Sequence, residues 1–195
     1  MKNSALFSTA INSFDEANAQ DPNHEIIEGK SYPKELIYAK RMTDRLYQFE
    51  PDASEALKLA VRCQHICRWE IPRSSYEMNK VGYIQWRNDL KKFHAKKAAE
   101  ILKITGYDEV LINQVEFLLL KKKLKKNAET QTLEDVVCLV FLQHYLDDFS
   151  EKSEPEKLMG IIQKTWKKMS GKGQKAALEL KLSPKASTLI SKALH

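Results

Sequence analysis

The sequence predicts an all-α protein, and three observations lead to that class. Apolar residues recur every three or four positions along most of the 195-residue chain, which is the helical period. No segment alternates apolar and polar residues over a useful length, as a half-buried strand would. No repeat of about 20 to 50 residues is visible, so we expect a multi-helix bundle rather than a repeat array. With 43% hydrophobic residues, the chain can bury a stable core without disulfides or a structural metal ion.

The first half is expected to hold three helices, at residues 4–19, 33–47 and 53–68. The first ends before the turn-forming residues 21–23, which include Pro22. Pro33 suits the first turn of the second helix because its missing N–H is not needed there. Asp52 is the expected N-cap of the third, with Glu55 completing a capping box.

The second half is expected to begin with a loop at residues 71–82, because Pro72 lacks an amide hydrogen and Gly82 adds backbone freedom. Helices should follow, at residues 82–104, 108–120 and 129–149. Gly106 is the expected stop signal between the first two. The lysine-rich run 121–126 is interpreted as a solvated helix end, not a nucleic-acid site.

The net charge of +6 lies entirely in the C-terminal segment. Residues 1–150 contain 22 basic and 22 acidic side chains, whereas residues 151–195 contain 10 basic and 4 acidic ones. We therefore predict a helical domain at 1–150 and a basic helical appendage at 151–195 that packs on it. The balanced charge of the first segment disfavours a basic groove for nucleic acid there, leaving the C-terminal segment as the place where such a partner could bind.

Three cysteines, an odd number among apolar neighbours, fit a reducing compartment better than a disulfide framework. Cys63 and Cys67 have the spacing of a zinc pair, but no second pair exists, so we interpret all three as small buried hydrophobic residues. No run approaches about 18 apolar residues, and the N-terminus has no signal-peptide core. A cytoplasmic protein without a membrane partner is expected.

Three polar side chains occupy positions where the helical period calls for apolar ones. His65 continues the row of apolar residues that includes Val61, and His94 follows Leu90 in a second apolar row. Asp135 stands at the start of a third apolar row, on a later helix. Two imidazoles and a carboxylate from three helices are a suitable ligand set for a divalent metal ion, so His65, His94 and Asp135 are the predicted metal ligands. The alternative for each is a hydrogen-bonded side chain of the core.

Arginines and aromatic rings gather around the loop at 71–82. A guanidinium fork can hold a phosphate or a carboxylate with two hydrogen bonds, and an aromatic ring can stack on a base. The alternative is that the arginines pair with nearby carboxylates and the rings fill the seam between helices. The residues that we expect to contact a small anionic or phosphorylated ligand are Arg62, Arg73, Arg87, Trp86 and Tyr83.

The motifs LAVRCQH at 59–65, FHA at 93–95 and LED at 133–135 together resemble the HD-domain superfamily of metal-dependent phosphohydrolases. That resemblance implies an HD-like helical bundle with a metal held by His65 and Asp135, and with His94 as an additional histidine. Ile66 stands where the superfamily has the aspartate of its His-Asp doublet. Glu134, the expected catalytic carboxylate, or a displaced water molecule is therefore expected to complete the site.

The motifs QHICRW, PRSSY, GYIQWR and LEDVVCLVFL resemble an uncharacterised family of helical domains from bacteria and fungi, over about residues 10–150. That family brings no established function. The sequence also lacks a P-loop, a dinucleotide-binding glycine turn and a GxSxG elbow, which argues against other common enzyme classes. We therefore expect a metal-dependent hydrolase of a small phosphorylated or nucleotide-like substrate. The alternative is a non-catalytic module that binds an anionic ligand, protein or RNA.

Overall fold

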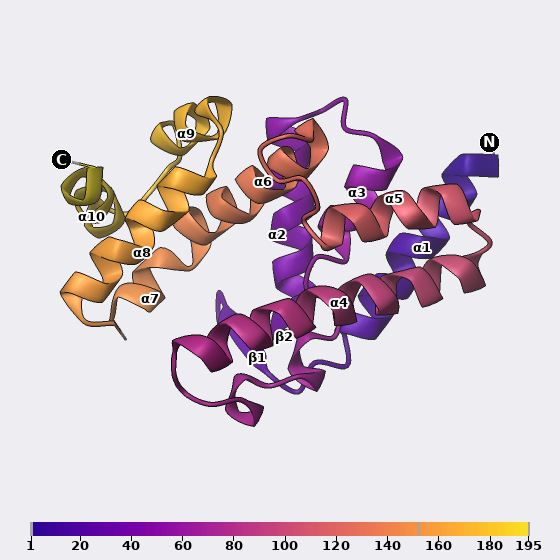
Figure 1. Ribbon diagram of the computed structural model, residues 1–195, viewed down its shortest axis with the longest axis horizontal. Coiled ribbons are helices and arrows are strands. Elements are labelled where there is room, and N and C mark those ends of the chain that lie inside the picture. Colours follow the sequence, from indigo (N-terminus) through magenta and orange to yellow (C-terminus); the bar gives the residue numbers. More distant parts are fainter. Residues whose placement is uncertain (1, 152, 195) are drawn as a thin grey trace. The chain divides into compact units, whose positions relative to one another are not determined.

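The computed structural model describes residues 2–151 and 153–194, and Figure 1 shows that these form helices apart from one two-stranded hairpin. The predicted all-α class is confirmed. The chain forms two compact units: unit 1 extends to Tyr47 and continues over Asp52–Lys122, and unit 2 comprises Gln48–Pro51 and the chain from Lys123 onward. The predicted division at residue 150 would fall inside unit 2.

Unit 1 is built from a hairpin and five helices among the described residues. Helix α4 packs against α1 and α5, and α3 packs against the same two helices. The last two residues of α2 belong to unit 2. The elements are α1 (Lys2–Asn18), β1 (His24–Ile27), β2 (Lys30–Pro33), α2 (Lys34–Phe49), α3 (Glu55–Arg62), α4 (Lys80–Thr105) and α5 (Glu109–Leu119).

The hairpin between α1 and α2 was not predicted from the sequence. Ile27 pairs with Lys30, so Glu28 and Gly29 alone form the turn, and both have positive φ, of 50° and 76°. Two-residue hairpin turns require such angles, and glycine adopts them without strain. The strands have only four residues each, too few to show an alternating pattern.

Helix α3 is shorter than predicted at both ends. Its N-cap is Ser54, not Asp52, because the Ser54 hydroxyl oxygen accepts the Leu57 amide at 3.1 Å. It ends at Arg62, and Cys67 adopts left-handed backbone angles before a single 3-10 turn at Arg68–Glu70. The predicted helix 53–68 was therefore too long. His65 lies in the irregular turn that follows α3 and not on a helical stripe.

Helix α4 begins at Lys80, two residues before the predicted start, and ends at Thr105, with the predicted stop signal Gly106 as its C-cap. The Asn79 side chain caps it by accepting the Gly82 amide at 2.9 Å, and Gly106 has φ of 100°. Gly82 is required by close approach of the loop, since a Cβ there would meet the Glu77 carbonyl oxygen at 2.2 Å. Within the loop, Arg73–Ser75 form a second 3-10 turn.

Unit 2 consists of helices packed around α6. Helix α6 contacts α7, α8 and α9, and α10 packs against α7 and α8. The predicted helix 129–149 is interrupted at Tyr145, which separates α6 from α7. The glycines at 171 and 173 lie in the first turn of α9. The elements are α6 (Ala128–His144), α7 (Leu146–Glu151), α8 (Pro155–Lys168), α9 (Gly171–Leu178) and α10 (Pro184–Leu194).

The three cysteines are free and buried, as the sequence predicted. The lysine run forms turns rather than the end of a helix: α5 ends at Leu119, and Lys121, Lys123 and Lys125 all have positive φ. Lys122 and Lys123 are exposed to solvent. None of the described helices combines the length and the apolar character that crossing a membrane requires.

Candidate functional site

Seven polar and aromatic side chains converge in unit 1 around His65. They come from α2, from the turn that follows α3, and from α4, so three separated stretches of sequence build the site. We call them the His65 cluster. Its members are Glu35, Tyr38, His65, Arg68, Trp86, Arg87 and His94.

Both ring nitrogens of His65 are engaged within the cluster. The ring stacks on Tyr38 with 4.2 Å between the centroids and 12° between the planes. Arg68 Nη1 lies 3.1 Å from His65 Nε2, and because a guanidinium can only donate, this nitrogen accepts. The ring proton is therefore on Nδ1, which lies 3.4 Å from Glu35 Oε2. Burial and the nearby Arg68 charge hold the pKa of His65 well below its usual value, so the ring is neutral.

Glu35 is the one carboxylate of the cluster, and its side chain is buried. Its two oxygens lie near His65 and, at 3.9 Å, near Arg68 Nε. Burial raises the pKa of Glu35 to about 7, although the Arg68 charge opposes that shift. Glu35 was not among the site residues expected from the sequence. An acidic residue in a first helical turn normally faces solvent, so nothing in the sequence pattern indicated its burial.

Arg68 is held on three sides. Besides the contacts with His65 and Glu35, its guanidinium lies over the Trp86 ring, 4.8 Å from the centroid. The Trp86 ring is fixed in turn, because its Nε1–H donates to the Ile71 carbonyl at 2.9 Å. The Arg68 side chain retains 22% exposure, so part of its positive charge faces solvent in a defined orientation.

His94 forms the buried end of the cluster, with 3% exposure. Its Nδ1 lies 2.8 Å from the Ile66 carbonyl oxygen, so Nδ1 carries the proton and donates. Nε2 therefore carries the lone pair, and it has no hydrogen-bond partner among the residues that the structure describes. The His94 and His65 rings lie 5.8 Å apart. Burial, together with the charges of Arg68 and Arg87, lowers the pKa of His94 to about 3.

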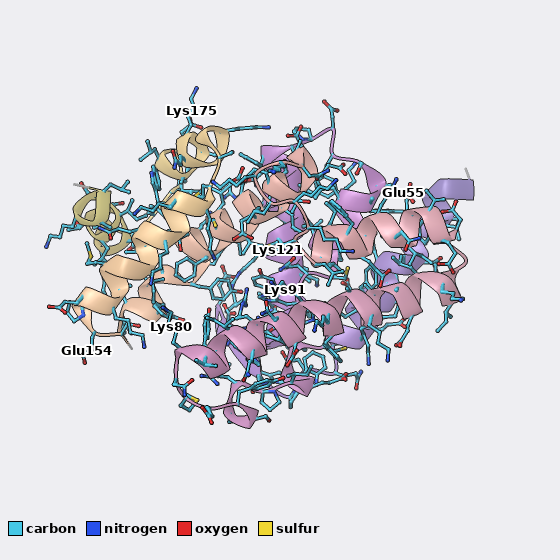
Figure 2. All side chains as sticks on the ribbon, viewed as in Figure 1. Glu55, Lys80, Lys91, Lys121, Glu154 and Lys175 are labelled. Atoms are coloured by element: carbon cyan, nitrogen blue, oxygen red, sulfur yellow. The ribbon has the colours of Figure 1, made fainter. Side chains whose placement is uncertain are left out.

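Arg87 supplies a second guanidinium, from α4. Its charge is close enough to lower the pKa of His65, His94 and Arg68. The side chain is half-buried, yet within residues 2–151 and 153–194 it makes no hydrogen bond and no ion pair. Lys121, which follows the end of α5 (Figure 2), adds a further positive charge near His65. The cluster thus has an excess of positive charge beside one carboxylate of raised pKa.

Arg62, predicted to contact a ligand, belongs instead to the scaffold. Its Nε and Nη2 donate to the two carboxylate oxygens of Asp15, at 2.7 and 2.5 Å, and its Nη1 donates to Thr43 Oγ1 at 3.1 Å. These bonds join α1, α2 and α3. The fork that would bind an anion is occupied by Asp15, so Arg62 is not available to a ligand in this geometry.

Arg73 also differs from the prediction. Its guanidinium donates to the backbone carbonyls of Tyr76, Glu77 and Asn79, at 3.1, 2.6 and 3.2 Å. The arginine therefore holds the loop at 71–82 in shape. The Asn79 carbonyl also accepts the Tyr83 amide, whereas for the Tyr76 and Glu77 carbonyls Arg73 is the donor among the described residues, which explains why an arginine occurs in this loop.

The two aromatic residues predicted to contact a substrate have different roles in the geometry. Trp86 is 9% exposed, with its indole N–H bonded to Ile71 and Arg68 over its ring, so it positions Arg68. Tyr83 is 50% exposed and lies 5.9 Å from Trp86. Its hydroxyphenyl ring remains accessible to a ligand.

Asp135 and Glu134 belong to unit 2. Asp135 is buried as predicted, but its oxygens accept the Ser170 amide at 2.8 Å, the Ser170 hydroxyl at 2.5 Å and Gln131 Nε2 at 3.0 Å. A Cβ at Gly173 would lie 2.7 Å from the Asp135 carboxyl carbon. Asp135 therefore secures the start of α9. Glu134 lies 3.6 Å from Lys168 Nζ.

The predicted metal ligands are thus distributed over both units, with His65 and His94 in unit 1 and Asp135 in unit 2. Within the described ranges, no group of three or more His, Cys, Asp or Glu side chains is arranged to hold a metal ion. The divalent metal ion and the catalytic role of Glu134 stay predictions.

The comparison with known families agrees with the second resemblance seen in the sequence. Residues 8–190 match the family described as a domain of unknown function, DUF4202, and the chain belongs to this family. The match spans both units. No curated protein and no solved structure matches the chain.

Proposed function

We propose that this DUF4202 protein binds a small phosphorylated ligand at the His65 cluster. The observation that carries the proposal is Arg87, a half-buried guanidinium without an ion pair or hydrogen bond among the described residues. Removing a charge from water is unfavourable unless a counter-charge is present. A second guanidinium, Arg68, lies near enough for the two charges to affect each other. An anion that both arginines bind would relieve this repulsion.

The charge state of the rest of the cluster supports an anionic ligand. Both histidines are neutral, so the net charge of the cluster is set by its two arginines and Glu35. Glu35 has its pKa raised to about 7, so close to neutral pH its carboxyl group is partly protonated, and an approaching anion would shift it further toward the neutral form.

The rigidity of Arg68 supports the same ligand class. Its contacts with His65, Glu35 and Trp86 fix the guanidinium before any ligand arrives. A donor that is already oriented loses less conformational entropy on binding, so a small ligand can bind with useful affinity. Phosphate has oxygens on several sides and suits two guanidinium forks that approach from different elements.

The test is calorimetric titration of the full chain with inorganic phosphate. We expect Arg87→Gln to weaken binding at least tenfold, the loss of about one charge-assisted hydrogen bond. Lys96→Gln is the matched control: it removes one positive charge from the same helix at a side chain that is 80% exposed, and affinity should change less than twofold. Absence of phosphate binding by the wild-type protein at millimolar concentration, or equal affinity in Arg87→Gln, would refute the proposal.

A second candidate is the metal-dependent hydrolase expected from the sequence, and the open lone pair on His94 Nε2 favours it. A neutral imidazole whose other nitrogen donates to a backbone carbonyl is the form in which histidine binds metals. His65 does not fit as the second ligand in this arrangement, because Arg68 occupies its Nε2 and Glu35 faces its Nδ1.

Metal analysis separates this candidate from simple binding. Protein purified without added metal would be analysed for bound Zn²⁺, Mn²⁺ and Fe, and then screened for phosphate release from phosphomonoesters with and without a chelator. A hydrolase should contain about one metal ion per chain and lose both metal and turnover in His94→Gln. Phosphate binding without bound metal and without turnover would support the binding function and exclude the hydrolase.

A further inference from the structure

We propose that the His65 cluster selects a phosphate group that carries a proton, and that it discriminates against sulfate. The inference deepens the proposed function and rests on it. Free hydrogen phosphate and the singly ionised form of a phosphomonoester both carry an O–H, whereas sulfate at neutral pH has four oxygens that can only accept. A site that contains donors and one well-placed acceptor can distinguish these anions although their sizes and charges are similar.

The acceptor is His94 Nε2. The Ile66 carbonyl fixes the proton on Nδ1, so the tautomer leaves a lone pair on Nε2. That nitrogen is buried and finds no donor among the residues that the structure describes. An unsatisfied buried acceptor costs about 1–3 kcal/mol, and a ligand O–H that donates to it would recover that cost on binding.

Of the other acceptors of the cluster, His65 Nε2 already has a donor, and the Glu35 carboxylate faces two N–H groups of the cluster. His65 Nε2 accepts from Arg68, and the Glu35 oxygens lie near His65 Nδ1 and Arg68 Nε. The side-chain exposure falls from 22% at Arg68 to 15% at His65, and His94 is the most buried of the three. The Arg68 guanidinium donors therefore lie nearer to solvent than the His94 acceptor.

Sulfate is disfavoured because one of its oxygens would face the His94 lone pair. The ring could avoid the clash only by taking a proton and becoming a donor. Burial and the charges of Arg68 and Arg87 oppose that change, since they lower the pKa of His94 to about 3. Near neutral pH the ring stays an acceptor, and the preference for an O–H donor is maintained.

The experiment compares phosphate with sulfate at matched ionic strength and about pH 7.5, by calorimetry on the full-length wild-type protein. We expect phosphate to bind at least tenfold more tightly than sulfate. In His94→Gln the side-chain amide can turn its NH₂ toward the ligand, so the preference should fall to threefold or less. Lys96→Gln should keep the wild-type preference.

A spectroscopic measurement on the wild-type protein tests the same contact without a substitution. With ¹⁵N-labelled histidine, the unprotonated ring nitrogen of His94 should shift upfield when phosphate is added, because it then accepts a hydrogen bond. Sulfate at equal saturation should leave this resonance in place. This arm decides the question if His94→Gln does not fold.

The outcomes separate the inference from the proposed function. Absence of binding by both anions refutes the proposed function. Equal affinity for phosphate and sulfate in the wild-type protein refutes the inference while leaving the binding site intact. A phosphate preference that persists in folded His94→Gln, or an unchanged His94 resonance with phosphate bound, also refutes it, because the discriminating acceptor would then be another group.

Discussion

Asp135 in unit 2 and His94 in unit 1 are both buried polar side chains on helices, with 2% and 3% exposure, but their hydrogen bonding differs. Asp135 receives three donors from Ser170 and Gln131. His94 donates once, to Ile66, and its acceptor nitrogen has no donor in the described part of the chain. A buried polar residue therefore indicates that a partner is needed. It does not indicate whether the fold or a ligand supplies that partner.

The surroundings explain the difference. Asp135 lies against the first turn of α9, where the backbone N–H groups have no helical partners, and Ser170 and Gly173 bring that turn close. His94 lies near Arg68 and Arg87, whose guanidinium groups do not reach its Nε2 with a hydrogen bond. The chain itself supplies the hydrogen-bond donors of Asp135. Around His94 it leaves an excess of positive charge and an acceptor nitrogen without a donor among the described residues.

Asp135→Ala should give the largest effect on the Asp135 side of this comparison. Removing the carboxylate leaves three donors without their acceptor, one of them the Ser170 amide, so unit 2 should lose about 3 kcal/mol of stability. Urea unfolding followed by circular dichroism measures the loss. Gln131→Ala, which removes one donor and keeps the others, should cost about 1 kcal/mol. If Asp135→Ala lost less than Gln131→Ala, the carboxylate would not be the structural cap described above.

The next effect concerns Glu35 and depends on pH. Because burial raises its pKa from 4.5 to about 7, the folded state binds more protons than the unfolded state between these values. Glu35 therefore contributes stability that is present below about pH 4.5 and is lost as the pH rises through about 7. His65 and His94, with lowered pKa, have the opposite dependence, so the wild-type curve alone is not diagnostic.

Comparison with Glu35→Gln isolates the carboxyl group. The stability of the variant relative to the wild type should rise by up to about 3 kcal/mol between pH 4.5 and 8, since glutamine does not ionise. Unfolding would be measured at several pH values in one buffer system. A difference between the two proteins that stays constant over this range would show that Glu35 titrates normally.

The smallest predicted effect is that of Trp86→Phe, which tests whether Trp86 positions Arg68 or contacts the ligand directly. Phenylalanine keeps an aromatic ring under the guanidinium but loses the Nε1–H bond to Ile71. Stability should fall by about 1 kcal/mol, and phosphate affinity should change less than threefold. A tenfold loss of phosphate affinity with unchanged stability would make the indole N–H a ligand donor.

The sequence by itself determined the helical class and much of the helix positions. The end of α4 before Gly106 and the start of α5 after Asp108 follow from local backbone chemistry, which acts within a few residues. The burial of His94 and Asp135 followed from helical periodicity for the same reason. Ser54 was missed as the α3 cap because Asp52 offered an equally good local signal.

Only the tertiary structure decided which buried or charged groups meet. Arg62 and Arg87 are the same residue type on neighbouring predicted helices, yet Arg62 pairs with Asp15, 47 positions earlier, and Arg87 has no such partner among the described residues. Glu35 joined the cluster because α2 packs its first turn beside the turn after α3. Charge pairing acts through space over a few ångströms, and residue order does not encode those distances until the helices have packed.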